Sequence, residues 1–192
     1  MSPSEPLSVL QDSLRGSPII WKGDYPYFIH PISDGIPRMD ADVLRATRDL
    51  IVEMVDWSKI DLIVSVEAMG LPLLAAVGEA TGKPTVVIRK REYGMEGEVR
   101  VDVSTGYSQS TTFINDISAG ERILIVDDVI STGGTLEPIL ATLEEMGVIL
   151  QDIVIAIEKG EGRERLAKER PRWPIRTLAR IDIIDGKVEI LE

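Results

Sequence analysis

The chain has 192 residues, no cysteine, one histidine and a formal net charge of -11 at pH 7. This composition excludes disulfides, thiolate metal sites and cysteine nucleophiles, and the acidic balance disfavours a basic surface for nucleic acid. A chain of this size buries a core without a covalent staple, so we expect one domain spanning residues 1–192.

The sequence predicts a cytoplasmic protein that binds neither a membrane nor nucleic acid. No apolar run approaches the ~20 residues that a membrane-spanning helix needs. The N-terminal segment, MSPSEPLSVLQDSLRGSP, lacks the basic start followed by an apolar stretch that marks a secretory signal.

The first sixty residues read differently from the rest of the chain. The segment WKGDYPYFIHPISDGIPRMD mixes aromatic residues, prolines and glycines, which predicts an irregular cap or a short hairpin. It is followed by DADVLRATRDLIVEMVDW, whose apolar residues fall near one face of a helix.

From residue 60 onward, short apolar runs alternate with helical stretches, which predicts βαβ units and the α/β class. The expected strands, buried on both faces of a parallel sheet, are LIVSV (62–66), TVVI (85–88), ILIV (123–126) and DIVIAI (152–157). The intervening helices are expected to end at Gly82 and Gly147. Ligands of such sheets bind beyond the carboxyl ends of the strands, so functional residues should follow each run.

Two later segments carry turn or loop signals. Residues 90–112 are polar and punctuated by glycine, which predicts a mobile lid beside a binding site. Within it, Tyr93 or Tyr107 either lies over the substrate or anchors the loop. Near the C-terminus, Asp185 and Gly186 between apolar runs predict a two-residue hairpin turn.

The strongest motif is ILIVDDVISTGGT, residues 123–135. Asp127 and Asp128 form a carboxylate pair that suits a sugar diol and can help to hold a hydrated Mg²⁺. A hydroxyl- and glycine-rich turn at a helix N-terminus suits a phosphate. The alternative is a simple strand-to-helix turn capped by Asp128. The turn positions are Ser131, Thr132, Gly133, Gly134 and Thr135.

This motif resembles the signature of the type I phosphoribosyltransferases. SVEAMGLP (65–72) resembles their pyrophosphate loop, and RKREYGMEGEV (89–99) resembles the start of their flexible catalytic loop. IEKGEGR (157–163) resembles a base-binding segment of bacterial xanthine phosphoribosyltransferases. The resemblance covers roughly residues 60–165 and is nearest to archaeal purine enzymes of the hypoxanthine/guanine and adenine type.

The resemblance implies a central, mostly parallel sheet flanked by helices. The core would span about residues 60–165, and a small hood would come from about 1–40 and 165–192. Asp127 and Asp128 would bind the ribose hydroxyls of phosphoribosyl pyrophosphate and Mg²⁺, and residues 131–135 its 5'-phosphate. The pyrophosphate loop, in which the family often has a non-proline cis peptide, would consist of Glu67, Ala68, Met69 and Gly70; a plain strand-to-helix turn is the alternative.

The triplet Arg89-Lys90-Arg91 is the densest basic spot of an acidic chain. A solvated surface is the usual interpretation of such a triplet, but next to phosphate-binding loops it supplies the positive potential that a polyphosphate needs. We therefore assign Lys90 and Arg91 to catalysis, because departure of pyrophosphate requires stabilisation of an anion. We also assign Asp128 to catalysis, as one of the pair that would bind the ribose hydroxyls and Mg²⁺.

Recognition of the base points to Lys159, which donates hydrogen bonds but cannot accept them and so suits the 6-oxygen of an oxopurine. The alternative is a surface lysine paired with Glu158 or Glu161. Phe28, His30 and Pro31 are candidates for the hood over the base, with Phe28 as readily a core residue and His30 structural. Many hypoxanthine-guanine enzymes carry a proposed acid/base aspartate where this chain has Ser131; Asp102 could substitute, or be an ordinary exposed aspartate.

The resemblance thus implies a purine-salvage enzyme that joins hypoxanthine or guanine to the ribosyl phosphate of phosphoribosyl pyrophosphate, with Mg²⁺, in paired subunits. Adenine is the second candidate base, and orotate is a distant third. A non-catalytic sensor of phosphoribosyl pyrophosphate is a different class of function that stays open. A generic nucleotide-binding domain lacks support, since the chain has no G-x-G-x-x-G or G-x-x-x-x-G-K-[ST] pattern.

Overall fold

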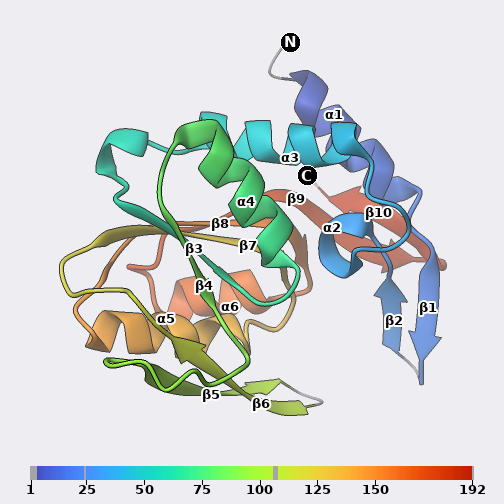
Figure 1. Ribbon diagram of the computed structural model, residues 1–192. Coiled ribbons are helices and arrows are strands. Elements are labelled where there is room, and N and C mark those ends of the chain that lie inside the picture. The colour runs from blue at the N-terminus through green and yellow to red at the C-terminus, as the bar shows by residue number, and fades with distance from the viewer. Residues whose placement is uncertain (1–3, 24, 106–107, 192) are drawn as a thin grey trace.

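The structure is a computed structural model that describes residues 4–23, 25–105 and 108–191. A central sheet lies between two helical layers, and a small hairpin stands beside it (Figure 1). The helices are α1 (Ser4–Arg15), α2 (Pro31–Asp34), α3 (Ala41–Met54), the short 3-10 helix η1 (Trp57–Lys59), α4 (Gly70–Thr81), α5 (Leu136–Glu145) and α6 (Gly162–Glu169). The strands are β1 (Ile19–Lys22), β2 (Tyr25–Phe28), β3 (Leu62–Val66), β4 (Thr85–Ile88), β5 (Val99–Thr105), β6 (Ser108–Ile114), β7 (Arg122–Ile130), β8 (Ile149–Lys159), β9 (Ile175–Ile184) and β10 (Lys187–Leu191).

The central sheet has the strand order β10-β9-β8-β7-β3-β4. All neighbouring pairs are parallel except β9 and β10, which confirms the predicted mostly parallel sheet. The chain passes from β3 to β4 on one side and then returns to β7 on the other side of β3. The order therefore reverses between β3 and β7, and the crevice at the carboxyl ends of these two strands is the expected place for a ligand.

The strands are buried because helices cover both faces of the sheet. Leu124 and Val126 belong to the core cluster that also contains residues of α1, α3 and α4. Ile123 and Ile125 point the other way, into the cluster that contains α5 and part of β5. Figure 1 shows these layers above and below the sheet. The continuous apolar runs therefore follow from burial on both faces.

The predicted helices are confirmed. Asp40 caps α3 by accepting a hydrogen bond from the backbone N–H of Asp42. Helix α4 ends at Gly82, whose φ of 67° is the left-handed conformation expected there. The buried face of α5 consists of Leu136, Ile139, Leu140 and Leu143, which recur at helical spacing. No helix within the described ranges is long and apolar enough to span a membrane.

Two strands extend further than the sequence predicts. β3 and β4 match their predicted ranges, but β7 continues to Ile130 and β8 to Lys159. The ladder between β7 and β8 runs as far as Ile130 and Glu158, and β8 still pairs with β9 at Lys159. Asp127, Asp128 and Lys159 thus lie inside strands rather than after them, because pairing with neighbouring strands continues through these polar residues.

The second half of the segment 90–112, for which a mobile lid is predicted, forms regular strands. β5 and β6 form an antiparallel hairpin whose register runs from Val99 opposite Ile114 to Thr105 opposite Ser108. Val101 and Val103 are buried in the cluster that contains α5. Alternating polar residues in VRVDV are typical of a strand with one buried face, and this pattern outweighs the glycines. Tyr107 lies outside the described residues.

The two ends of the chain meet on one side of the sheet. The hairpin of β1 and β2 is formed as expected, and it stands with α2 near β9 and β10 (Figure 1). The C-terminal segment contributes more than a hood, since β9 and β10 extend the central sheet beyond residue 165. Asp185 and Gly186 have φ values of 52° and 72°, as the predicted turn between these strands requires.

Candidate functional site

A cavity of about 1040 Å³ opens at the carboxyl ends of β7 and β8. Its walls come from the β1–β2 hairpin, α2, the turn at residues 131–135 and one side of α6. The predicted site residues that line it are Asp127, Asp128, Ser131, Thr132, Gly133, Gly134, Thr135 and Lys159. These residues, which the sequence predicts from separate segments, therefore share a single cavity.

Asp127 and Asp128 form a pair of half-buried carboxyl groups on one side of this cavity. The backbone N–H of Asp128 donates to Asp127 Oδ1 at 3.0 Å. Burial raises the pKa of both carboxyl groups, and the neighbouring charge of Asp127 raises the pKa of Asp128 further. The nearby Lys90 ammonium opposes this rise at Asp127. The pair is thus poised to bind hydroxyl donors or a cation that relieves its repulsion.

The predicted pyrophosphate loop packs directly against Asp127. The Glu67–Ala68 peptide bond is cis, in agreement with the resemblance. A Cβ atom on Gly70 would lie 2.6 Å from Asp127 Oδ1 and 1.9 Å from Ser65 Oγ. Only glycine fits there, and the backbone at the start of α4 therefore approaches the carboxylate closely.

The Glu67 side chain turns toward the basic triplet rather than into the cavity. Its Oε2 accepts hydrogen bonds from Arg89 Nε at 2.9 Å and from the backbone N–H of Lys90 at 3.0 Å. The bond from Lys90 contributes most to lowering the pKa of Glu67. Arg89 and Arg91 both approach the ring of Tyr93, each at 5.8 Å. Lys90 and Arg91 are exposed and lie outside the lining of the cavity in the described part of the chain.

The hydroxyl- and glycine-rich turn is held in place by α6. Gly133 has a φ of 79°, and the backbone N–H of Gly134 donates to Thr132 Oγ1 at 3.3 Å. The N–H of Gly162 donates to the Ser131 carbonyl at 2.8 Å. A Cβ on Gly162 would lie 2.2 Å from that same carbonyl oxygen. The turn and the start of α6 therefore form one rigid wall.

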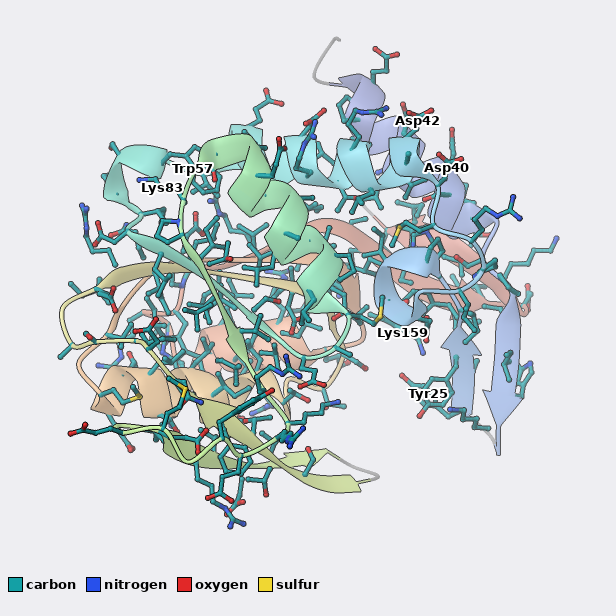
Figure 2. All side chains as sticks on the ribbon, viewed as in Figure 1. Tyr25, Asp40, Asp42, Trp57, Lys83 and Lys159 are labelled. Carbon is teal, nitrogen blue, oxygen red and sulfur yellow. The ribbon has the colours of Figure 1, made fainter. Side chains whose placement is uncertain are left out.

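Lys159, at the end of β8, also lines the cavity and is only 8% exposed. Its Nζ donates to the carbonyl of Pro26 at 2.7 Å and lies 4.0 Å from the centre of the Tyr25 ring. Figure 2 labels both residues, with Tyr25 on the hairpin that stands beside the sheet. Glu158 instead pairs with Arg163 at 2.6 Å and with Arg180 at 3.5 Å. Burial in the cavity wall therefore does not fit the alternative of a surface lysine.

The comparisons with known proteins decide the family. A family described as "Phosphoribosyl transferase domain" matches residues 36–174. The chain belongs to the phosphoribosyl transferase family. A "Hypoxanthine/guanine phosphoribosyltransferase" of Methanotorris igneus is 46% identical over 183 residues, covering 95% of this chain and all of the relative. A protein of the same description from Methanobrevibacter ruminantium is 46% identical over 182 residues, covering 95% of this chain and 96% of the relative.

Solved structures of the family share the fold. An adenine phosphoribosyltransferase from Thermoanaerobacter pseudethanolicus superposes with a TM-score of 0.75 at 23% identity, covering 91% of this chain and 99% of the other. The Rhodothermus marinus adenine enzyme gives a TM-score of 0.74 at 24% identity, covering 92% of this chain and 99% of the other. At this level of identity the likeness confirms the predicted phosphoribosyltransferase fold and leaves the base open.

The site contains two residues that sequence reasoning missed. Arg165 of α6 lines the cavity, donates to the Thr132 carbonyl at 3.1 Å and pairs with Glu137 at 2.8 Å. Tyr25 lines the opposite side, and its hydroxyl lies 3.5 Å from Ser131 Oγ. Burial alone would raise the pKa of Tyr25, but its hydrogen bonds to Lys159 and Ser131 and the charge of Lys159 outweigh burial and lower it. Neither residue belongs to a local motif, so sequence patterns gave no signal.

Other candidates lie away from the cavity or serve the fold. The ring of His30 accepts the N–H of Ile32 at Nδ1, and its Nε2 lies 3.0 Å from Ser13 Oγ, which indicates a structural role. Phe28 is 7% exposed and belongs to the core cluster, although it also touches the cavity. Asp102 is exposed on β5 and pairs with Arg100 at 3.0 Å, as an ordinary surface aspartate does.

Proposed function

We propose that the protein transfers the phosphoribosyl group of phosphoribosyl pyrophosphate to a 6-oxopurine, hypoxanthine or guanine, and releases pyrophosphate. The supporting observation is that one cavity joins a diol-binding carboxylate pair, a phosphate-type turn and the buried donor Lys159. The description of the archaeal relatives as hypoxanthine/guanine enzymes agrees with a donor at the base.

Each wall of the cavity has a separate task in this reaction. The turn at residues 131–135 binds the 5'-phosphate through its hydroxyls and backbone N–H groups. Asp127 and Asp128 accept hydrogen bonds from the ribose hydroxyls. Lys159 donates to the 6-oxygen and so holds the purine nitrogen facing the anomeric carbon. The bond from that nitrogen to carbon forms as the carbon–oxygen bond to pyrophosphate breaks, and the imidazole proton of the base is released to water.

Charge stabilisation at the leaving group falls to Lys90 and Arg91. The anomeric carbon becomes cationic as pyrophosphate departs, so the anion needs positive charge beside it and water must be excluded. Glu67 fixes the backbone of Lys90 at the end of β4, next to the loop that contains Gly70. These basic residues are therefore tethered beside the carboxylate pair although they do not line the cavity.

The carboxylate pair also fits a magnesium ion. The described residues contain no group of three or more histidine, cysteine or acidic side chains that could hold a metal ion alone. Mg²⁺ commonly takes one or two carboxylates, with substrate phosphates and water as the other ligands. Asp127 and Asp128 would hold it, and when bound it would neutralise charge on the pyrophosphate.

The test is a panel of bases with Mg²⁺ and phosphoribosyl pyrophosphate, in which nucleotide formation is followed for hypoxanthine, guanine, xanthine, adenine and orotate. We expect product from hypoxanthine and guanine. Product from adenine alone would overturn the base assignment, and no product from any base would favour a non-catalytic sensor. Lys159→Ala should reduce use of oxopurines selectively, and an equal loss for adenine would contradict its role.

We also propose that the protein acts in the cytoplasm as a homodimer, as the family resemblance suggests. Sedimentation equilibrium of the purified chain tests the subunit number. A monomeric mass at micromolar concentration would contradict the dimer and leave the base assignment standing.

A further inference from the structure

The β1–β2 hairpin reaches the base end of the cavity through two adjacent residues. The carbonyl of Pro26 takes one N–H of the Lys159 ammonium at 2.7 Å, and the Tyr25 ring lies 4.0 Å from the same nitrogen. β1 and β2 pair only with each other, so these contacts join a separate two-stranded sheet to β8. The hairpin therefore determines where this buried charge points.

A lysine ammonium discriminates poorly between ligands unless its position is fixed. The side chain has a flexible four-carbon stem, and its nitrogen has three donors that can rotate. A cation held against an aromatic face is stabilised most where water is excluded. With Lys159 only 8% exposed, Tyr25 and the Pro26 carbonyl together fix the nitrogen and leave at least one of its three donors for a ligand.

We propose that Tyr25 is a specificity-determining positioning residue, whose ring holds Lys159 Nζ in the place from which it donates to the 6-oxygen of the purine. This inference rests on the proposed function. The tyrosine is itself held at its far end, where its hydroxyl lies 3.5 Å from Ser131 Oγ in the predicted phosphate turn. The ring thus spans the cavity between the phosphate end and the base end.

A different role for Tyr25, stacking on the purine, predicts a different result. A stacked ring contacts every purine alike, so its loss would weaken all of them equally. A ring that acts through Lys159 matters only for purines with an acceptor at position 6. The informative quantity is therefore a ratio between two bases that differ in that oxygen and in the proton on the neighbouring N1.

The experiment measures KM for hypoxanthine and the inhibition constant of unsubstituted purine, which lacks the 6-oxygen, as a competitor of hypoxanthine. In Tyr25→Leu we expect the ratio of the purine constant to the hypoxanthine constant to fall about tenfold, a change of ~1.4 kcal/mol in selectivity. Tyr25→Phe keeps the ring and should keep most of the ratio. Trp21→Leu on the same hairpin is the matched control, since its ring is exposed and does not line the cavity of the described residues, and the ratio should stay at the wild-type value.

Three results would overturn the inference. Equal weakening of both bases in Tyr25→Leu would indicate stacking, and unchanged constants for both bases would show that the ring does not act through Lys159. Loss of the ratio in Tyr25→Phe as large as in Tyr25→Leu would assign the effect to the hydroxyl. The proposed function fails separately, if the wild-type protein forms no nucleotide from hypoxanthine or guanine. Thermal unfolding of each variant shows whether it is folded.

Discussion

Gly70 lies against Asp127 so closely that a Cβ on the glycine would come within 2.6 Å of Asp127 Oδ1. The same Cβ would lie 1.9 Å from Ser65 Oγ, a buried atom on β3. The predicted pyrophosphate loop after β3 and the acidic pair of β7 are thus in contact at the point where the strand order reverses. The missing side chain at residue 70 makes this contact possible.

Gly70→Ala is expected to damage both stability and ligand binding. The added methyl has no space, and overpacking of this kind typically costs about 1–3 kcal/mol. Relief by movement of Asp127 would separate the carboxylate from the ribose hydroxyls, so affinity for phosphoribosyl pyrophosphate should fall as well. Urea unfolding and calorimetric titration measure the two effects.

Gly16→Ala provides the control for this substitution. Its Cβ would meet only backbone oxygens at 3.7 and 3.9 Å, which are ordinary contacts. Stability and affinity should stay near the wild-type values in this variant. Wild-type affinity in Gly70→Ala would show that the close approach to Asp127 is unimportant for binding.

Glu67 should affect binding of the donor through the basic triplet. Its carboxylate accepts from Arg89 Nε and from the Lys90 N–H, and hydrogen bonds to a charged group contribute about 1.5–3 kcal/mol. We expect Glu67→Ala to raise KM for phosphoribosyl pyrophosphate at least ~10-fold, since ~1.4 kcal/mol corresponds to tenfold. Glu67→Gln keeps an acceptor oxygen and should lose less, and steady-state kinetics with varied donor test the difference.

The reverse ranking of the two variants would contradict this role. If Glu67→Gln were as impaired as Glu67→Ala, the negative charge of Glu67 would be responsible, and not its acceptor bonds from Arg89 and Lys90. KM for the base serves as the internal control, because Glu67 lies outside the cavity lining that contains Lys159.

Local hydrophobic patterns were sufficient to predict the strands of the parallel core. Runs such as LIVSV are buried on both faces, and β3 and β4 begin and end where the pattern predicts. The acidic pair and the turn at residues 131–135 were also found in one motif, because consecutive residues build that wall. The hairpin turn at Asp185 and Gly186 was readable for the same reason.

What the sequence missed depends on contacts between distant residues. Tyr25 and Ser131 are 106 positions apart, and Lys159 and Pro26 are 133 apart. Strand pairing likewise carries β8 through Lys159. Arg165 contacts the turn from another helix. Such relationships arise from tertiary packing, which a single sequence without an alignment does not display.

Asp128→Asn is expected to make the free protein more stable while weakening ligand binding. Burial and the adjacent Asp127 raise the pKa of Asp128, which means that the fold disfavours its charged form. A neutral amide of similar shape removes this repulsion, so the melting temperature should rise. Affinity for phosphoribosyl pyrophosphate with Mg²⁺ should fall, since the amide is a weaker partner for a diol or a cation.

Thermal scanning and titration calorimetry measure the two quantities for Asp128→Asn. Asp182→Asn, an exposed aspartate on β9, is the control and should change neither quantity. An Asp128→Asn protein that binds the donor with wild-type affinity would remove the carboxylate pair from the proposed site.

His30 should make the stability of the fold, and not catalysis, sensitive to acid. Burial lowers the pKa of His30 from 6.5 to about 4, although the charge of Asp34 acts in the opposite direction. Above pH 6.5 the ring is neutral in both the folded and the unfolded chain, so its contribution to stability is fully present. As pH falls from 6.5 to about 4, the unfolded chain takes up a proton that the folded chain does not, and stability is lost.

The expected loss from this residue is about 3 kcal/mol, because each pKa unit corresponds to ~1.36 kcal/mol. His30→Gln cannot take up this proton, so the difference in unfolding free energy between wild type and variant should shrink between pH 7 and pH 4. Urea unfolding curves at intervals across that range measure it. A constant difference over the range would show that His30 titrates alike in both states, and its bonds to Ile32 and Ser13 would then not require a neutral ring.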